Sequence, residues 1–293
     1  MDRLLSGRAG ATYLRLYDED GVALDPTGQT ATVSVRDADG TVVSSGSTTR
    51  VSAGYYKYAI AKTVLNYLGQ YDVTWTYTIS GVSSTSESTF ESVGSYVFEL
   101  PELRAFDPSL SDTVKYTAEM LRQARTSAEE RLEEAAGVSF TRRAKQVTLS
   151  SLDRDRLILP DCEVTDILSV MVDEDGDGNF VALDNDQFDA IEISPDGVLK
   201  KVDYINWVEG TNNYLVEYEY GFKTVPTPVK RAALMLAFEA LVPSALPARA
   251  TSQSTDLGEF RVSIANVDLG RYTGIPDVDA VIAQFGRRKP AVG

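Results

Sequence analysis

The sequence SDTVKYTAEMLRQARTSAEERLEEAA, residues 111–136, predicts a long helix. Its apolar residues recur at steps of three or four, which places them on one face of an α-helix; they are Val114, Ala118, Leu121, Ala124, Ala128, Leu132 and Ala135. Ser111 and Asp112 are both suitable N-caps, and Gly137 is suited to end the helix. Strand patterns lie on both sides of this helix, so the sequence predicts an α+β protein.

The rest of the helix surface is charged, with opposite signs at helical spacing. Its residues are Lys115, Glu119, Arg122, Arg125, Glu129, Glu130, Arg131, Glu133 and Glu134. Two interpretations stay open. Charges of this kind usually form a solvated face, whereas in an oligomer they form a seam between subunits.

Before the helix, residues 11–92 alternate between apolar and polar side chains, with the period of two that half-buried strands have. Turn dipeptides such as Asp39-Gly40 and Ser80-Gly81 separate the strands. We therefore predict an immunoglobulin-like β-sandwich over residues 1–95, without the Cys and Trp signature of true immunoglobulin domains. The predicted inward residues are Leu14, Leu16, Val33, Val35, Tyr56, Tyr58, Ile60, Val73, Trp75, Tyr77 and Ile79.

A second domain, an α+β domain of residues 96–250, is predicted from the boundary that Pro101 and Pro108 mark. After the long helix it contains short strands, which lie at Lys145–Ser150, Val164–Val172, Phe180–Leu183, Gly197–Val202 and Tyr214–Tyr220. Thr227 and Pro228 then begin a helix that continues to Val242, and 11 of the 14 residues from position 229 onward are apolar. A helix that is apolar nearly all round must be buried, and we expect a neighbouring subunit to cover Leu236 and Phe238.

The last segment, residues 251–293, is predicted to be an arm that docks on a partner. Phe260, Val262 and Ile264 alternate as a short strand that could be added to an exposed sheet edge. A short helix is expected at residues 276–285. The basic residues Arg287, Arg288 and Lys289 follow it, and we expect them to meet an acidic partner surface.

Composition excludes much of enzyme chemistry. The chain has no histidine and one cysteine, Cys162, which removes imidazole catalysis, histidine-bound zinc and intrachain disulfides. With 28 Lys and Arg against 43 Asp and Glu, the net charge of −15 disfavours a general grip on nucleic acid. We therefore predict no cofactor and no enzymatic activity. We also predict no export signal and no membrane span, because the longest apolar run is only residues 232–238.

An acidic stretch, residues 173–184, has the spacing of a calcium loop: Asp173, Asp175 and Asp177 occupy positions 1, 3 and 5, and Asp184 occupies position 12. The flanking patterns are strands, however, and not the two helices of an EF-hand. A solvated acidic hairpin turn is the preferred interpretation, and these four aspartates are only weak candidates for a metal site.

From Pro101 onward the order of segments resembles the head-to-tail connector, or adaptor, proteins of tailed bacteriophages. PELRAF at 101–106 leads into the long helix, which ends in EEAAGVSF at 133–140. LILP at 157–160, VMVD at 170–173 and VEYEYGF at 216–222 follow, and PTPVK at 226–230 begins the buried helix. YTGIPDVDAVI at 272–282 is similar to connector proteins of actinobacterial siphophages.

The resemblance implies a virion protein at the head–tail junction, synthesised in the bacterial cytoplasm. It implies a ring, twelve-fold in this family, that binds the portal protein and the next neck or tail protein and lets DNA pass through its channel without sequence-specific binding. The sandwich would be an addition to the minimal connector. The alternative is a calcium-dependent binding or adhesion module built on the β-sandwich.

Overall fold

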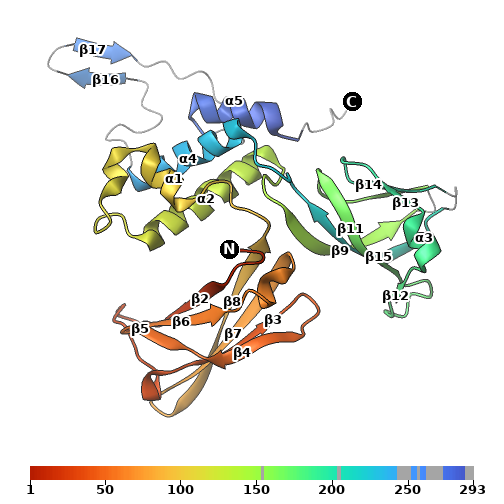
Figure 1. The fold of residues 1–293 in the computed structure, drawn as a ribbon, viewed down its shortest axis with the longest axis horizontal. Helices are drawn as coiled ribbons and strands as arrows, with labels where there is room; N and C mark the ends of the chain where they lie inside the picture. The colour runs from red at the N-terminus through yellow and green to blue at the C-terminus, as the bar shows by residue number, and fades with distance from the viewer. Residues whose placement is uncertain (153–154, 203–205, 243–251, 256–257, 262–272, 288–293) are drawn as a thin grey trace. The chain divides into compact units, whose positions relative to one another are not determined.

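The structure is a computed structural model, and it describes residues 1–152, 155–202, 206–242, 252–255, 258–261 and 273–287. It contains both helices and sheets, which confirms the predicted α+β class (Figure 1). The chain divides into two compact units. The first, which we call the β unit, combines residues 1–95 with residues 142–221, and the second, the helical unit, combines residues 96–141 with residues 222–293.

The first part of the β unit is a sandwich of two sheets. One sheet has the order β1 (Asp2–Leu5), β8 (Val82–Val93), β7 (Gly69–Ile79), β3 (Thr32–Arg36) and β4 (Val42–Ser47), and the other has the order β2 (Gly10–Arg15), β6 (Tyr55–Ile60) and β5 (Thr49–Ser52). Only β1, which pairs with β8, is parallel to its neighbour. Single turns of 3₁₀-helix lie at Thr27–Gln29 and Val64–Asn66.

Residues from both sheets share one core, because alternate side chains of each strand point inward. Val35, Tyr56 and Trp75 are fully buried in it. The hairpin between β7 and β8 turns at Ser80 and Gly81, whose φ values of 51° and 82° are both positive. Two positive φ values match the right-handed twist of the strands, so the turn dipeptide fixes the register in which Ile79 faces Val82.

The second part of the β unit, residues 142–221, contains two smaller sheets. The four-stranded sheet has the order β12 (Val181–Ala182), β11 (Val164–Val172), β15 (Gly210–Tyr220) and β9 (Arg143–Ser151), and the three-stranded sheet has the order β10 (Arg156–Ile158), β14 (Val198–Lys201) and β13 (Ile191–Ile193). The short helix α3 (Asn185–Asp189) precedes β13. Trp207, Tyr214 and Tyr218 fill the core between them.

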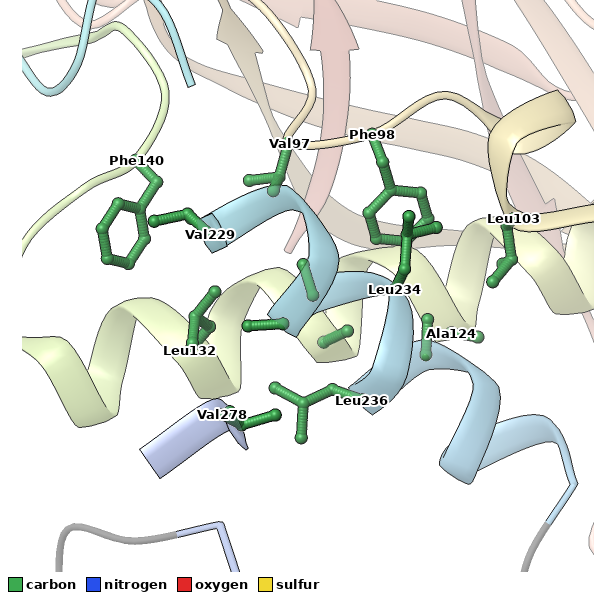
Figure 2. Close-up of a cluster of buried hydrophobic side chains, with 14 of the residues drawn as sticks. Val97, Phe98, Leu103, Ala124, Leu132, Phe140, Val229, Leu234, Leu236 and Val278 are labelled. Atoms are coloured by element: carbon green, nitrogen blue, oxygen red, sulfur yellow. The ribbon is translucent and has the colours of Figure 1, made fainter. Parts of the chain in front are cut away.

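The helical unit is built from segments that are far apart in the sequence. It contains α1 (Leu100–Phe106), a 3₁₀ turn (Pro108–Ser111), α2 (Ala118–Ala136), α4 (Thr227–Leu241) and α5 (Pro276–Phe285), together with a hairpin of β16 (Ser252–Thr255) and β17 (Gly258–Arg261) (Figure 1). The small side chains of α4, such as Ala233 and Ala237, are fully buried. Together the helices form one apolar core (Figure 2).

The long helix begins seven residues later than the apolar spacing predicts. The Asp112 carboxylate accepts the backbone N–H groups of Val114 and Lys115, which holds this segment as a turn. Val114 is therefore 88% exposed and is not part of the apolar face. The N-cap is Thr117 and not Ser111 or Asp112, so that prediction is wrong. Gly137 ends the helix in the left-handed conformation, as predicted.

The grouping of segments also differs from the linear domains that the sequence suggests. Residues 142–221 leave the predicted 96–250 domain and join the β unit. In the predicted docking arm, α5 packs into the helical core, because Val278 and Ile282 face α2 and α4 and are almost completely buried. The short helix predicted at 276–285 has the bounds of α5.

Candidate functional site

The α4 helix is the centre of the helical unit. Lys230 in its first turn forms an ion pair with Glu102 of α1, with 2.8 Å between Nζ and Oε1. Further along, Leu236 is 3% exposed and points into the core formed with α2 and α5 (Figure 2). Phe238 is only partly buried, and its ring lies edge-on to that of Phe106 with 5.9 Å between the centroids.

These positions revise the interface predicted on α4. Leu236 is covered by helices of its own chain, so its burial requires no neighbouring subunit. Phe238 and the 39% exposed Phe106 form an apolar pair at the margin of the core. Of the two predicted interface residues, only Phe238 has part of its side chain available to a partner.

Three charged residues of α2 that the sequence places on the outer face are buried. Arg125, Glu129 and Glu133 are 4%, 1% and 8% exposed. Burying a charge is costly unless it is paired or hydrogen-bonded, so each of them must have partners inside the unit. The sequence contains no signal for this, because an amphipathic helix has charges of the same types on its solvated face.

Glu129 and Glu133 accept hydrogen bonds from the two segments of the helical unit that lie next to its boundaries in the sequence. Glu129 accepts the backbone N–H of Val97 at 2.8 Å, next to the boundary at residues 95 and 96. Glu133 accepts the Ser139 hydroxyl at 3.0 Å and the Phe140 N–H at 3.1 Å, next to the boundary at residues 141 and 142. The guanidinium of Arg125 lies 3.3 Å from the centre of the Tyr96 ring, a cation–π contact.

Phe140, which donates its N–H to Glu133, also belongs to a cluster of three phenylalanines. The ring centroids of Phe140 and Phe222 are 5.7 Å apart, and that of Phe285 is 6.5 Å from the first and 6.3 Å from the second. The backbone N–H of Arg287 donates to the Ala136 carbonyl at 2.8 Å. The end of α5 is thereby fixed to the end of α2.

Most of the other residues predicted to form docking contacts in the arm lie outside the residues that the structure describes. Arg287 is exposed, as a docking residue needs to be. Arg288, Lys289, Val262 and Ile264 lie outside the described residues. For Phe260 the structure gives only its place on β17, opposite Gln253 of β16.

The acidic loop is a network of turns. The Asp173 carboxylate, 8% exposed, accepts the backbone N–H groups of Gly176, Asp177 and Gly178 at 2.8–3.2 Å. Asp184 caps α3 through the N–H of Gln187. Within the described residues, no group of three or more candidate ligands could hold a metal ion.

The other two aspartates of the acidic loop, Asp175 and Asp177, are exposed. Hydrogen bonds from the backbone and side chain of Asn179 hold the pKa of Asp177 below its usual value. The geometry agrees with the interpretation as an acidic turn, in which Asp and Gly are the residues that tolerate the turn conformation.

Elsewhere in the β unit, Asp25 is a carboxylate with several hydrogen-bond donors. It accepts from the Arg50 guanidinium, the Gly54 N–H and the Tyr56 hydroxyl, and hydrogen bonding to Arg50 is the main reason that its pKa lies well below the usual range. Burial, followed by the bond to Asp25, raises the pKa of Tyr56 to about 12. This network fixes β5 and β6 to the segment that follows β2.

Comparison with protein-family models gives no match, and comparison with curated proteins gives none. Among solved structures, a chain from the neck of an empty gene transfer agent (GTA) particle, computed with C6 symmetry, is similar over 67% of this chain and 93% of that chain, with 15% identity and a TM-score of 0.46. A chain from the neck of the native particle, computed with C12 symmetry, is similar over 68% of this chain and 97% of that one, with 15% identity and a TM-score of 0.41.

A thermostable endoglucanase from Alicyclobacillus acidocaldarius matches 61% of this chain and 23% of its own length, with 11% identity and a TM-score of 0.21. Of the helices in the described part of the chain, none has both the length and the apolar character needed to span a bilayer.

Proposed function

We propose that this protein is a structural component of the neck of a phage-like particle, where copies form a ring between portal and tail. One observation supports this most directly. Two of the segments that resemble connector proteins, residues 101–140 and 272–282, are separated by 131 residues of sequence, and the described parts of both belong to one helical core together with α4. These two segments therefore belong to one folded unit, whereas the similar segments at 157–160 and 170–173 lie in the β unit.

The distribution of charge suits a protein through which DNA passes. Residues 142–221 contain 18 Asp and Glu against 7 Lys and Arg, so most of the net charge of −15 belongs to this part of the β unit. Like charges repel DNA phosphates, so the protein would extend a DNA channel without binding the DNA tightly or reading its sequence.

The partners in this proposal are other copies of the chain, in a ring for which twelve subunits are expected, the portal protein, and the next neck or tail protein. The protein would be made in the host cytoplasm and function in the virion, with no enzymatic activity, cofactor or membrane. The Phe106 and Phe238 pair and the exposed Arg287 are the described candidates for contacts with these partners.

Negative-stain electron microscopy of the purified protein tests the proposal. We expect rings with a central hole wide enough for duplex DNA. In the producing strain, deletion of the gene should yield DNA-filled heads without tails. Monomers at every concentration, together with normally tailed particles from the deletion strain, would overturn the proposal.

A further inference from the structure

A lysine occupies a buried position in the three-stranded sheet of the β unit. Lys201 is the last residue of β14, the central strand, and it shares a face of the sheet with the fully buried Leu199. Lys201 itself is only 6% exposed. Lysine is almost never buried to this extent unless its charge is paired, because removing an ammonium group from water is costly. We therefore expect the charge of Lys201 to have a partner.

The described residues contain no carboxylate that pairs with Lys201. Its ammonium group forms no ion pair and no hydrogen bond with any of them, although residues 142–221 contain 18 Asp and Glu. It lies 4.9 Å from the centre of the Trp207 ring, which is a cation–π contact. This contact stabilises the charge in part, but the N–H donors of the ammonium group still have no acceptor.

The indole N–H of Trp207 is a second donor without an acceptor. Trp207 is fully buried, and within the described part of the chain its Nε1 has no hydrogen-bond partner. The other tryptophan, Trp75, has the usual arrangement, because its Nε1 donates to the Ser88 hydroxyl at 2.9 Å. A buried donor without a partner in the protein is typical of a position that binds a water molecule or an ion.

Hydrogen bonds hold the segment that carries Trp207. The Ser151 hydroxyl donates to the Trp207 carbonyl at 3.1 Å, and the Asn213 side chain donates to the Val208 carbonyl at 3.0 Å. The Val208 N–H donates to the Tyr214 hydroxyl at 2.9 Å. The Trp207 and Tyr214 rings lie edge-on, with 5.2 Å between their centroids. The indole is therefore fixed, and its N–H cannot turn to another acceptor without breaking these contacts.

We propose that Lys201 and Trp207 bind one small oxyanion, a carboxylate or a phosphate. An ammonium group and an indole N–H can only donate hydrogen bonds, so their ligand must be an acceptor. The positive charge of Lys201 favours an anion over water, because hydrogen bonds between charged groups are the stronger ones. An oxyanion also has several oxygens, so it can accept from both donors at once.

The burial of the site decides the size of the ligand. Lys201 and Trp207 are 6% and 0% exposed, which leaves access only for a small solute. The phosphates of duplex DNA are excluded, because they cannot reach these side chains and because the carboxylates of residues 142–221 repel a polyanion.

The anion would connect the two sheets of residues 142–221. Lys201 ends β14 of the three-stranded sheet, and Trp207 lies three residues before β15 of the four-stranded sheet. A ligand that binds only the folded arrangement stabilises it, so the bound anion should stabilise the packing of the two sheets. This inference does not depend on the proposed function in the neck.

Nuclear magnetic resonance of the full chain with isotope-labelled tryptophan tests the site. The chain has two tryptophans, so the spectrum contains two indole N–H signals, and the Trp207→Phe variant assigns them. Sodium formate and sodium phosphate are the probes, titrated separately at neutral pH and equal ionic strength. We expect the Trp207 signal to shift and to saturate with at least one probe, and the Trp75 signal to stay in place, because its N–H already has an acceptor. The probe that binds more tightly identifies the class of the anion.

The Lys201→Met variant tests the role of the charge. It removes the ammonium group but keeps an apolar side chain, so it should raise the dissociation constant of the probe at least tenfold. Lys62→Met, the matched control at an exposed lysine of the sandwich, should change it less than twofold. Lys201→Gln replaces Lys201→Met if that variant does not fold.

The melting temperature gives a second measurement that does not depend on the size of any assembly. The probe should raise the melting temperature of the wild type and of Lys62→Met more than that of Lys201→Met. The variants must be compared, because phosphate also stabilises folded proteins through exclusion from their surface. No saturable shift of the Trp207 signal with either probe, equal shifts of both indole signals, or binding by Lys201→Met at wild-type affinity would each overturn the inference.

Discussion

Replacement of Leu236 by alanine tests whether α4 belongs to the core of one subunit. The side chain is 3% exposed, and the substitution removes three carbon atoms, worth about 0.8 kcal/mol each by transfer. The cavity that remains adds to this, so we expect the free energy of unfolding to fall by about 3 kcal/mol. With a slope of about 2 kcal/mol/M, the urea midpoint should move down by about 1.5 M.

Far-UV circular dichroism at 222 nm is the suitable signal, because the long helices all lie in the helical unit. The shift of the urea midpoint should be the same at protein concentrations about fifty-fold apart, because the stability of a core within one subunit does not depend on association. Met235→Ala, at a partly buried neighbouring position, should have a smaller effect. A destabilisation that disappears at high concentration would place Leu236 between subunits, and an unchanged midpoint would refute its burial.

Four further predictions concern other parts of the chain. Glu133→Ala should lower the stability of the helical signal by about 1–3 kcal/mol, because it leaves the Phe140 N–H buried without its acceptor, whereas Glu134→Ala at an exposed site should have little effect. Removal of residues 276–293 should destabilise the helical unit in the same assay, because it removes the buried Val278 and Ile282. The pKa of Tyr56 is raised to about 12, so the stability that its protonated hydroxyl contributes is present below pH ~10 and is lost as the pH rises through 12. The difference in absorbance at 295 nm between wild type and Tyr56→Phe should titrate near 12. A midpoint near 10 would contradict this prediction. Calorimetry with Ca²⁺ should show millimolar affinity at best, because the Asp173 carboxylate already accepts three N–H groups, and micromolar binding with a raised melting temperature would revive the calcium-dependent alternative.

The sandwich is the part of the fold that its sequence specifies most directly. The alternation that predicts Val33, Val35 and Trp75 as inward residues is a local property of each strand, and all three are buried. The start of α2 is also a local matter, but two local signals compete there. The side chain of Asp112 binds the N–H groups of residues 114 and 115, and this turn prevails over the apolar spacing that includes Val114.

The buried charges of α2 could not be predicted in this way. Glu129 is matched by the N–H of Val97, 32 residues earlier in the sequence, and Arg125 by the ring of Tyr96. Which charges of an amphipathic helix are buried depends on where the rest of the chain passes, and this is decided by tertiary structure. The packing of α5 into the core is also decided by tertiary structure. The sequence of α5 predicts an amphipathic helix, but it does not indicate which element covers the apolar face.

The discontinuous helical unit determines the order in which the protein can fold during synthesis. The α2 helix ends at residue 136 and α4 ends at residue 241, so at about 5–20 residues per second the ribosome needs roughly 5–21 seconds to supply the helix that covers it. The sandwich and the strands of residues 142–221 are complete before that moment, whereas the apolar face of α2 waits in water and is a natural substrate for a chaperone. A nascent chain that has not yet reached α4 and α5 therefore has no finished helical unit to offer to its neighbours.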